Sequence, residues 1–168
     1  PTLHPDFPGI IADTIRIRKQ YSPQSRIVVL SNASLAHLEG VKEALSQVDR
    51  NILKLDTGIE ETFHRLNQPA KGITLEKMIR NLKLFDRNLI IQTLFVRGSH
   101  KGNTIDNTAE HELNALLALY DDIRPAEVQV YTFARDTPIG SLIRIPVAEL
   151  EAIAVRIQEL GIETSVYG

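Results

Sequence analysis

Short runs of β-branched and aliphatic residues alternate along the chain with longer stretches whose apolar residues recur every three or four positions. The short runs are typical of buried strands, and the longer stretches are typical of amphipathic helices. The pattern predicts strands at 26–31, 52–56, 89–97 and 127–133, with a weaker one at 162–167. Because strands and helices alternate, the order predicts an α/β fold with a parallel sheet.

Several of the predicted helices have recognisable ends. Ser34 and Thr74 are candidate N-caps, each placed just before a stretch of helical apolar spacing. Pro146 lies in the predicted first turn of the last helix, and Gly161 ends that helix. The remaining predicted helices lie at about 6–20, at about 59–66 and from about Thr108 onward.

The number of strands limits the architecture. Five strands in 168 residues are too few for a closed eight-stranded barrel, which takes about 250 residues. The chain also opens with a predicted helix, where a regular strand-then-helix series would open with a strand. We therefore expect a single domain over 1–168, either as an open doubly wound sheet or as part of a barrel whose first strands are missing. The pattern alone does not decide between the two.

Composition narrows the chemistry. The 19 basic and 21 acidic residues are mixed along the chain, so charge indicates no particular partner. The chain has no cysteine, which excludes disulfides and thiolate ligands within these residues, and its histidines lack metal-ligand spacing. No stretch approaches the roughly 20 apolar residues of a membrane span. We expect a cytoplasmic protein without membrane contact and without a metal site formed by these residues.

Polar residues lie where the first two predicted strands end. They are Ser31 and Asn32 at the end of the first strand, and Lys54 and Asp56 at the end of the second. Ligands of parallel sheets bind at the carboxyl ends of strands. Lys54 and Asp56 should point to the same face, because side chains alternate along a strand. Burying charge is costly unless it is paired or used, so the pair is either a structural ion pair or a ligand contact.

The next two predicted strands each carry one glutamine among apolar residues, Gln92 and Gln129. Each is either a hydrogen-bonded core amide or a ligand contact. Arg97 and Tyr131 lie near the ends of the same strands. The segment 97–103 has the glycines and donors of an anion cradle but fits no defined phosphate motif, so we expect a flexible surface loop there.

Three segments together carry a family resemblance: 1–7 (PTLHPDF), 29–35 (VLSNASL), and 53–69, which contains LKLDTG and ends in Asn67-Gln68-Pro69. They resemble the radical S-adenosylmethionine (SAM) superfamily, particularly the branch that contains glycyl-radical activating enzymes and wyosine-type tRNA enzymes. The third segment is the most specific. In the second, Ser31 replaces a threonine and Ala33 departs from a glycine. The resemblance extends to about residue 160, with weaker matches at 96–98 and 132–135.

The resemblance implies a partial parallel (β/α)6 barrel of which this chain supplies the third strand onward. The first two strands, with the Cys-x3-Cys-x2-Cys loop that binds a [4Fe-4S] cluster, would lie upstream of Pro1. The parent protein would be an oxidoreductase that reductively cleaves SAM to methionine and a 5′-deoxyadenosyl radical, which abstracts a hydrogen atom from a substrate. The fragment alone would be inert and would bind neither cofactor.

The resemblance also implies roles for the polar residues at the strand ends. SAM would be contacted by Ser31, Asn32, Lys54, Asp56, Gln92 and Gln129, and substrate by Arg97 and Tyr131. A protein or a tRNA are the macromolecular substrates that the family branch implies. No residue is assigned a catalytic role.

Two alternatives remain open. In the first, Lys54 is a Schiff-base nucleophile whose pKa is lowered by burial, and Asp56 shuttles protons, as in aldolase-like barrels. In the second, the chain is a binding module without chemistry, and the two residues form only an ion pair. In any partial barrel, strand 26–31 would have an unpaired edge, so we expect the isolated chain to self-associate.

Overall fold

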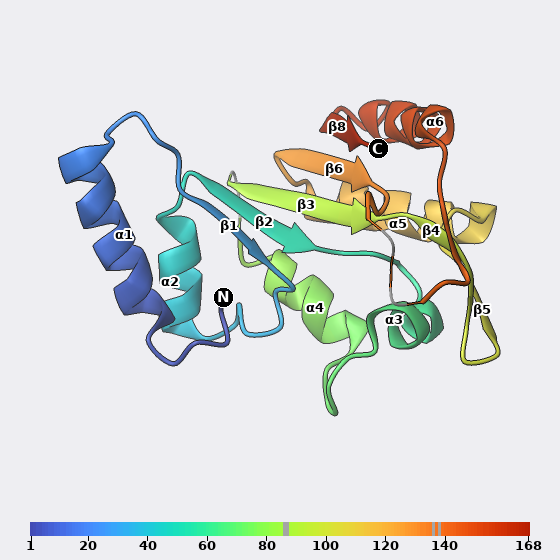
Figure 1. Cartoon of the computed structure of the whole chain (residues 1–168), viewed down its shortest axis with the longest axis horizontal. Helices are drawn as coiled ribbons and strands as arrows, with labels where there is room; N and C mark the ends of the chain where they lie inside the picture. The colour runs from blue at the N-terminus through green and yellow to red at the C-terminus, as the bar shows by residue number, and fades with distance from the viewer. Residues whose placement is uncertain (86–87, 136, 138) are drawn as a thin grey trace.

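The protein is described by a computed structural model that covers residues 1–85, 88–135, 137 and 139–168. Its centre is a five-stranded sheet in which all neighbouring strands are parallel (Figure 1). In spatial order the strands are β1 (Val28–Ser31), β2 (Arg50–Lys54), β3 (Leu89–Leu94), β6 (Glu127–Tyr131) and β8 (Glu163–Tyr167). The five predicted strands are therefore confirmed, although most are shorter than expected.

At least one helix lies between each pair of parallel neighbours, because a parallel connection must cross back over the sheet. The helices are α1 (Phe7–Tyr21), α2 (Glu39–Ser46), α3 (Glu60–Asn67), α4 (Leu75–Leu82), α5 (Glu110–Ile123) and α6 (Val147–Gln158). None of the helices in the described part of the chain is long and apolar enough to cross a membrane.

The two faces of the sheet differ in their cover. Val29, Leu53 and Ile91 point to one face and are buried in the hydrophobic core with side chains of the helices. Val28 and Leu30 point to the opposite face and are about half exposed, at 51% and 47%. We call this second side the open face. A doubly wound sheet is covered on both faces, whereas this α/β fold is a partial parallel (β/α) barrel with helices on one side.

A second, antiparallel sheet was not predicted. It consists of β5 (Asn103–Asp106), β4 (Val96–His100) and β7 (Leu142–Arg144), in that order. The prediction of a flexible surface loop at 97–103 is therefore wrong, because this segment belongs to a β-hairpin. Gly98 permits the pairing with β7, since a Cβ there would lie 2.1 Å from the carbonyl oxygen of Ser141.

The two proposed helix caps had different outcomes. Thr74 caps α4 as predicted, and its Oγ1 accepts a hydrogen bond of 3.3 Å from the amide of Lys77. Ser34 does not cap a helix, because α2 begins only at Glu39. The Ser34 hydroxyl instead donates to Asn32 Oδ1 at 2.9 Å, within the turn that follows β1.

Candidate functional site

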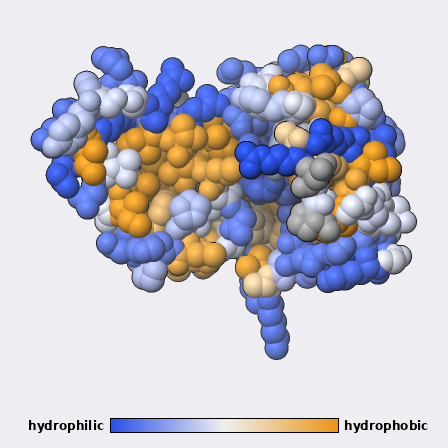
Figure 2. All heavy atoms as spheres, viewed as in Figure 1, coloured by the Kyte–Doolittle hydropathy of each residue, from blue (hydrophilic) through white to orange (hydrophobic). Residues whose placement is uncertain are grey.

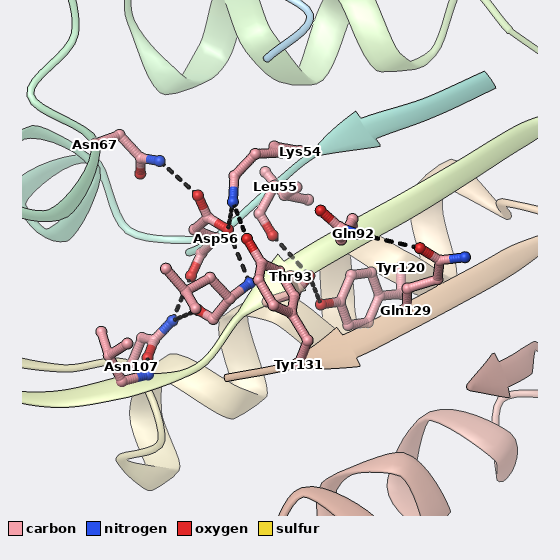
Figure 3. A network of polar contacts seen from close by, with 12 residues as sticks. Lys54, Leu55, Asp56, Asn67, Gln92, Thr93, Asn107, Tyr120, Gln129 and Tyr131 are labelled. Atoms are coloured by element: carbon pink, nitrogen blue, oxygen red, sulfur yellow. Dashed lines mark hydrogen bonds and ion pairs between the residues drawn. The ribbon is translucent and has the colours of Figure 1, made fainter. Parts of the chain in front are cut away.

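Lys54 and Asp56 meet at the carboxyl end of β2 (Figure 3). Lys54 Nζ lies 3.3 Å from Asp56 Oδ1. The Asp56 side chain is buried, with 3% exposure, and that of Lys54 keeps 25%. Of the two interactions left open for these residues, the structure shows the ion pair, and contact with a ligand stays a prediction. The pair lies at the end of the sheet where ligands of such folds bind.

The Asp56 carboxylate is fixed by donors from two further elements. Its Oδ1 accepts a hydrogen bond of 2.9 Å from the amide of Leu94, at the end of β3. Its Oδ2 accepts one of 2.6 Å from Asn67 Nδ2, at the end of α3. Because three donors converge on one buried carboxylate, its position is determined before any ligand arrives.

Lys54 also contacts a strand that is not its neighbour. Its Nζ donates a hydrogen bond of 2.5 Å to the hydroxyl of Tyr131 on β6 and lies 5.0 Å from the centre of that ring. Burial lowers the pKa of Lys54, but Asp56 and the Tyr131 hydroxyl raise it by more, so this pKa lies above its usual value of 10.5. A Schiff-base nucleophile needs a lowered pKa, so the aldolase-like alternative is not favoured.

A cavity of about 250 Å³ opens at the carboxyl ends of β1 and β2. Its polar wall is formed by Asn32, Ser34, Lys54, Asp56 and Asn67, and its apolar wall includes Leu3, Phe63 and Met78. Ligand sites of this kind combine an apolar lining with a few converging polar groups. This cavity is therefore the candidate functional site.

The two glutamines form a ladder across the open face, beside the cavity. Gln92 Nε2 donates to Gln129 Oε1 at 3.2 Å, and Gln129 Nε2 donates to Glu127 Oε1, also at 3.2 Å. Glu127 in turn pairs with Arg50 at 2.5 Å. Both glutamines are thus hydrogen-bonded amides of the sheet, and neither lines the cavity. Contact with a ligand stays a prediction for them.

Ser31 and Arg97 lie outside the cavity. Ser31 is buried on the helix-covered side of β1, where its Oγ is 2.9 Å from the hydroxyl of Thr2 and accepts from the amide of Ala33 at 3.2 Å. These contacts fix the turn that carries Asn32. Arg97 lies on β4, where it pairs with Glu149, and this hydrogen bond raises the pKa of its guanidinium.

Asn107 is a structural residue of the site that sequence reasoning missed. Its Nδ2 donates to the backbone oxygens of Asp56 and Leu94, at 2.8 and 2.6 Å. Its Oδ1 accepts from the amide of Val96 at 2.8 Å. It thereby satisfies the backbone where β2 and β3 end. An asparagine between two elements gives no sequence signal for such a role.

Glu112 was missed as well, although it is a buried carboxylate with 1% exposure. Its Oε2 accepts a hydrogen bond of 2.6 Å from Thr57, and its Oε1 accepts one from Thr62. These bonds tie the loop after Asp56 to α5. Among the described residues, no group of three or more His, Asp or Glu side chains could hold a metal ion.

Two solved structures share this fold. A domain of pyruvate-formate lyase-activating enzyme from Bacteroides vulgatus superposes with a TM-score of 0.64 at 12% identity, covering 98% of this chain and 96% of that one. A radical SAM methyltransferase from Sphaerobacter thermophilus superposes with a TM-score of 0.56 at 15% identity, covering 84% of this chain and 40% of that one. At these identities the likeness shows the fold alone.

Sequence comparison finds relatives but no matching family profile. The UPF0026 protein slr1464 of Synechocystis sp. is 32% identical over 116 residues, and a UPF0026 protein of Helicobacter pylori is 26% identical over 138. This chain spans 40% and 41% of their lengths. GTPase Obg of Brachyspira hyodysenteriae is 25% identical over 141 residues, which make up 19% of its length. These comparisons favour neither the aldolase-like enzyme nor the binding module without chemistry.

Proposed function

We propose that this chain is the C-terminal part of the barrel of a cytoplasmic radical SAM oxidoreductase, folded as one domain. One observation carries the proposal: a fixed lysine and aspartate pair lines a cavity at the carboxyl ends of parallel strands, in a fold shared with radical SAM structures. Because the chain spans two fifths of its UPF0026 relatives, the activity belongs to a longer protein.

The donors in the cavity suit SAM, which presents a carboxylate and ribose hydroxyls. The Lys54 ammonium has three protons, and its described contacts with Asp56 and Tyr131 use two of them. Asn32 accepts from Ser34 through its Oδ1, so its amide protons remain for a ligand. SAM, when bound and reduced, supplies a 5′-deoxyadenosyl radical for hydrogen abstraction. The role of this chain is to bind and orient SAM.

The residues of this chain do not fit a [4Fe-4S] cluster. The sequence has no cysteine, and the described residues form no other cluster of metal ligands. The cluster would therefore be held by another part of the longer protein. The chain by itself is expected to be inactive, and no step of the chemistry is assigned to its residues.

The remaining predicted contacts extend this proposal. Gln92 and Gln129 would face SAM from the open face, where their ladder is rigid. Tyr131 would separate SAM from substrate, because its hydroxyl already contacts Lys54. Arg97 would contact a larger substrate, a protein or a tRNA, from the second sheet. Ser31 would act indirectly, by fixing the turn that carries Asn32.

The test is equilibrium dialysis of SAM against the longer protein. Lys54→Met should weaken SAM binding at least tenfold, because it removes the free donor in the cavity. Lys42→Met is the control, since Lys42 is also a paired lysine but its contact with Glu39 lies outside the cavity and the glutamine ladder. Equal loss in the two variants, or none in Lys54→Met, would contradict the proposed site.

A further inference from the structure

A larger groove lies beside the candidate site, between α4 and the turn that follows β1. Its volume is about 470 Å³, which is within the range of ligand-binding clefts. Ser34, Ile73 and Met78 line both this groove and the cavity of Lys54 and Asp56, so the two adjoin each other. The other residues that line the groove, among them His37, Lys77, Arg80 and Leu84, have no role in the proposed SAM site.

Both walls of the groove are held in place by hydrogen bonds. Asn81 Nδ2, on α4, donates to the backbone oxygens of Ala33 and Ser34 at 2.8 and 3.4 Å. Ala33 adopts a left-handed conformation, with φ of 61°, and is fully buried. On the other side, Lys77 Nζ donates to the backbone oxygen of Gly72 at 2.6 Å. The groove is therefore preformed, which reduces the entropy lost on binding.

The lining of the groove combines an apolar floor with a basic rim. The floor is formed by Leu35, Ile73, Met78 and Leu84, and Leu84 is 41% exposed. The rim carries His37, Lys77 and Arg80, all exposed. Among the described residues, no acidic side chain and no Phe, Tyr or Trp lines the groove. The closest carboxylate to Arg80 is that of Glu76, at 3.9 Å, and both of these side chains are largely exposed.

We propose that this groove docks an acidic, amphipathic peptide segment of a partner protein. Covering the apolar floor is favourable when the ligand places apolar side chains on it, because burial of apolar surface stabilises a complex. Of the three basic residues of the rim, only Arg80 has a carboxylate within 4 Å among the described residues, so the rim attracts carboxylates and orients the approaching segment. A nucleic acid fits less well, because the floor offers no aromatic side chain on which bases could stack.

Because the groove adjoins the cavity, a docked segment would lie beside the candidate site. This places a partner protein next to the candidate site without requiring that SAM binds there. The docking proposal therefore stands or falls independently of the proposed function.

The test begins with selection of 12-residue peptides from a random phage-displayed library on the immobilised protein. The selected sequences should be enriched in Asp and Glu interspersed with Leu, Ile or Phe. Binding of the best peptide, measured by fluorescence anisotropy, should weaken at least tenfold in the variant Lys77→Glu/Arg80→Glu and also in Leu84→Asp. It should weaken as salt rises, because surface charges are screened.

The matched control is Arg16→Glu/Lys19→Glu, which makes the same change of charge on exposed residues of α1 and should leave the affinity unchanged. Circular dichroism establishes that each variant is folded. Absence of enrichment, or selected peptides that bind the Lys77→Glu/Arg80→Glu variant as well as the unaltered protein, would overturn the proposal. Tighter binding of a labelled 20-nucleotide single strand, lost in the same variant, would replace it with nucleic-acid binding.

Discussion

Lys54 and Tyr131 are in contact although β3 lies between their strands. Lys54 aligns with Gln92 on β3, whereas Tyr131 aligns with Leu94, so the lysine side chain reaches over β3 toward the carboxyl end of β6. Its Nζ donates a hydrogen bond of 2.5 Å to the Tyr131 hydroxyl while it contacts Asp56. The three side chains therefore join β2 and β6 across the end of the sheet.

This arrangement predicts how stability depends on alkaline pH. The pKa of Lys54 is raised above 10.5 in the folded state, so its contribution is fully present below pH 10.5 and is lost as pH rises through the folded pKa. Lys54→Met should have a smaller fall in the free energy of unfolding between pH 9 and 12. Urea unfolding at several pH values measures this dependence. The same pH dependence of the free energy of unfolding in the variant and the unaltered protein would contradict the prediction.

Tyr120 should also make the free energy of unfolding fall at alkaline pH. Burial raises the pKa of Tyr120 well above the usual value of 10, and the charge of Asp56 adds to this, although the hydrogen bond with Thr93 lowers it. The stabilising effect of the neutral phenol is present below pH 10 and is lost above it. Tyr120→Phe can be measured in the same series of urea unfolding experiments. Its free energy of unfolding should fall less at alkaline pH than that of the unaltered protein.

A second prediction concerns the Asp56 carboxylate. In Asp56→Asn, one accepting oxygen becomes an amide that faces a donor, either Asn67 Nδ2 or the amide of Leu94. We expect a loss of about 2–4 kcal/mol in the free energy of unfolding. The matched control is Asp13→Asn, which breaks an exposed pair with Arg16 and should change stability by less than about 0.5 kcal/mol. A loss of similar size in both variants would contradict the network.

A third prediction follows from Asn51, which is fully buried on the helix-covered side of β2. Neither its amide nitrogen nor its oxygen has a hydrogen-bond partner within the described part of the chain. Asn51→Leu should therefore raise the free energy of unfolding by about 1–3 kcal/mol, because an uncompensated buried amide is removed. Asn81→Leu should lower it, since Asn81 donates to Ala33 at 2.8 Å. Thermal unfolding of the two variants compares them directly.

Local sequence patterns accounted for the central parts of the fold. The helical spacing after Thr74 and the cap itself are local features, and both are present in the structure. The antiparallel sheet could not be anticipated in this way, because β4 pairs with β7 about 45 residues further along the chain. The polar residues around Gly98 resemble a loop when they are considered without that partner.

The same distinction applies to the site. That Lys54 and Asp56 share a face follows from the alternation within a single strand and was predicted, with an ion pair as one of the two interactions left open. The contact of Lys54 with Tyr131 depends on the register of three strands, which the sequence does not display. Ser31 shows the limit of strand-end reasoning, because the strand places its side chain on the helix-covered face.

The exposed edge of β1 leads to a fourth prediction. Figure 2 shows apolar side chains gathered over β1 and β2, and Val28 and Leu30 are about half exposed there. We propose that the isolated chain self-associates through this edge. Val28→Lys/Leu30→Lys should shift it toward the monomer in sedimentation velocity. Val155→Lys on α6, where Val155 is 53% exposed, is the control and should not. A monomer at high concentration without any substitution would contradict the prediction.

The most direct test of the central claim is to determine the coding sequence upstream of Pro1 in the source gene. We predict a Cys-x3-Cys-x2-Cys loop, followed by a strand that leads into Pro1, because the proposed binding of SAM in this cavity would require a cluster that the residues of this chain cannot hold. An upstream sequence without such a cysteine loop would contradict the assignment to a radical SAM oxidoreductase.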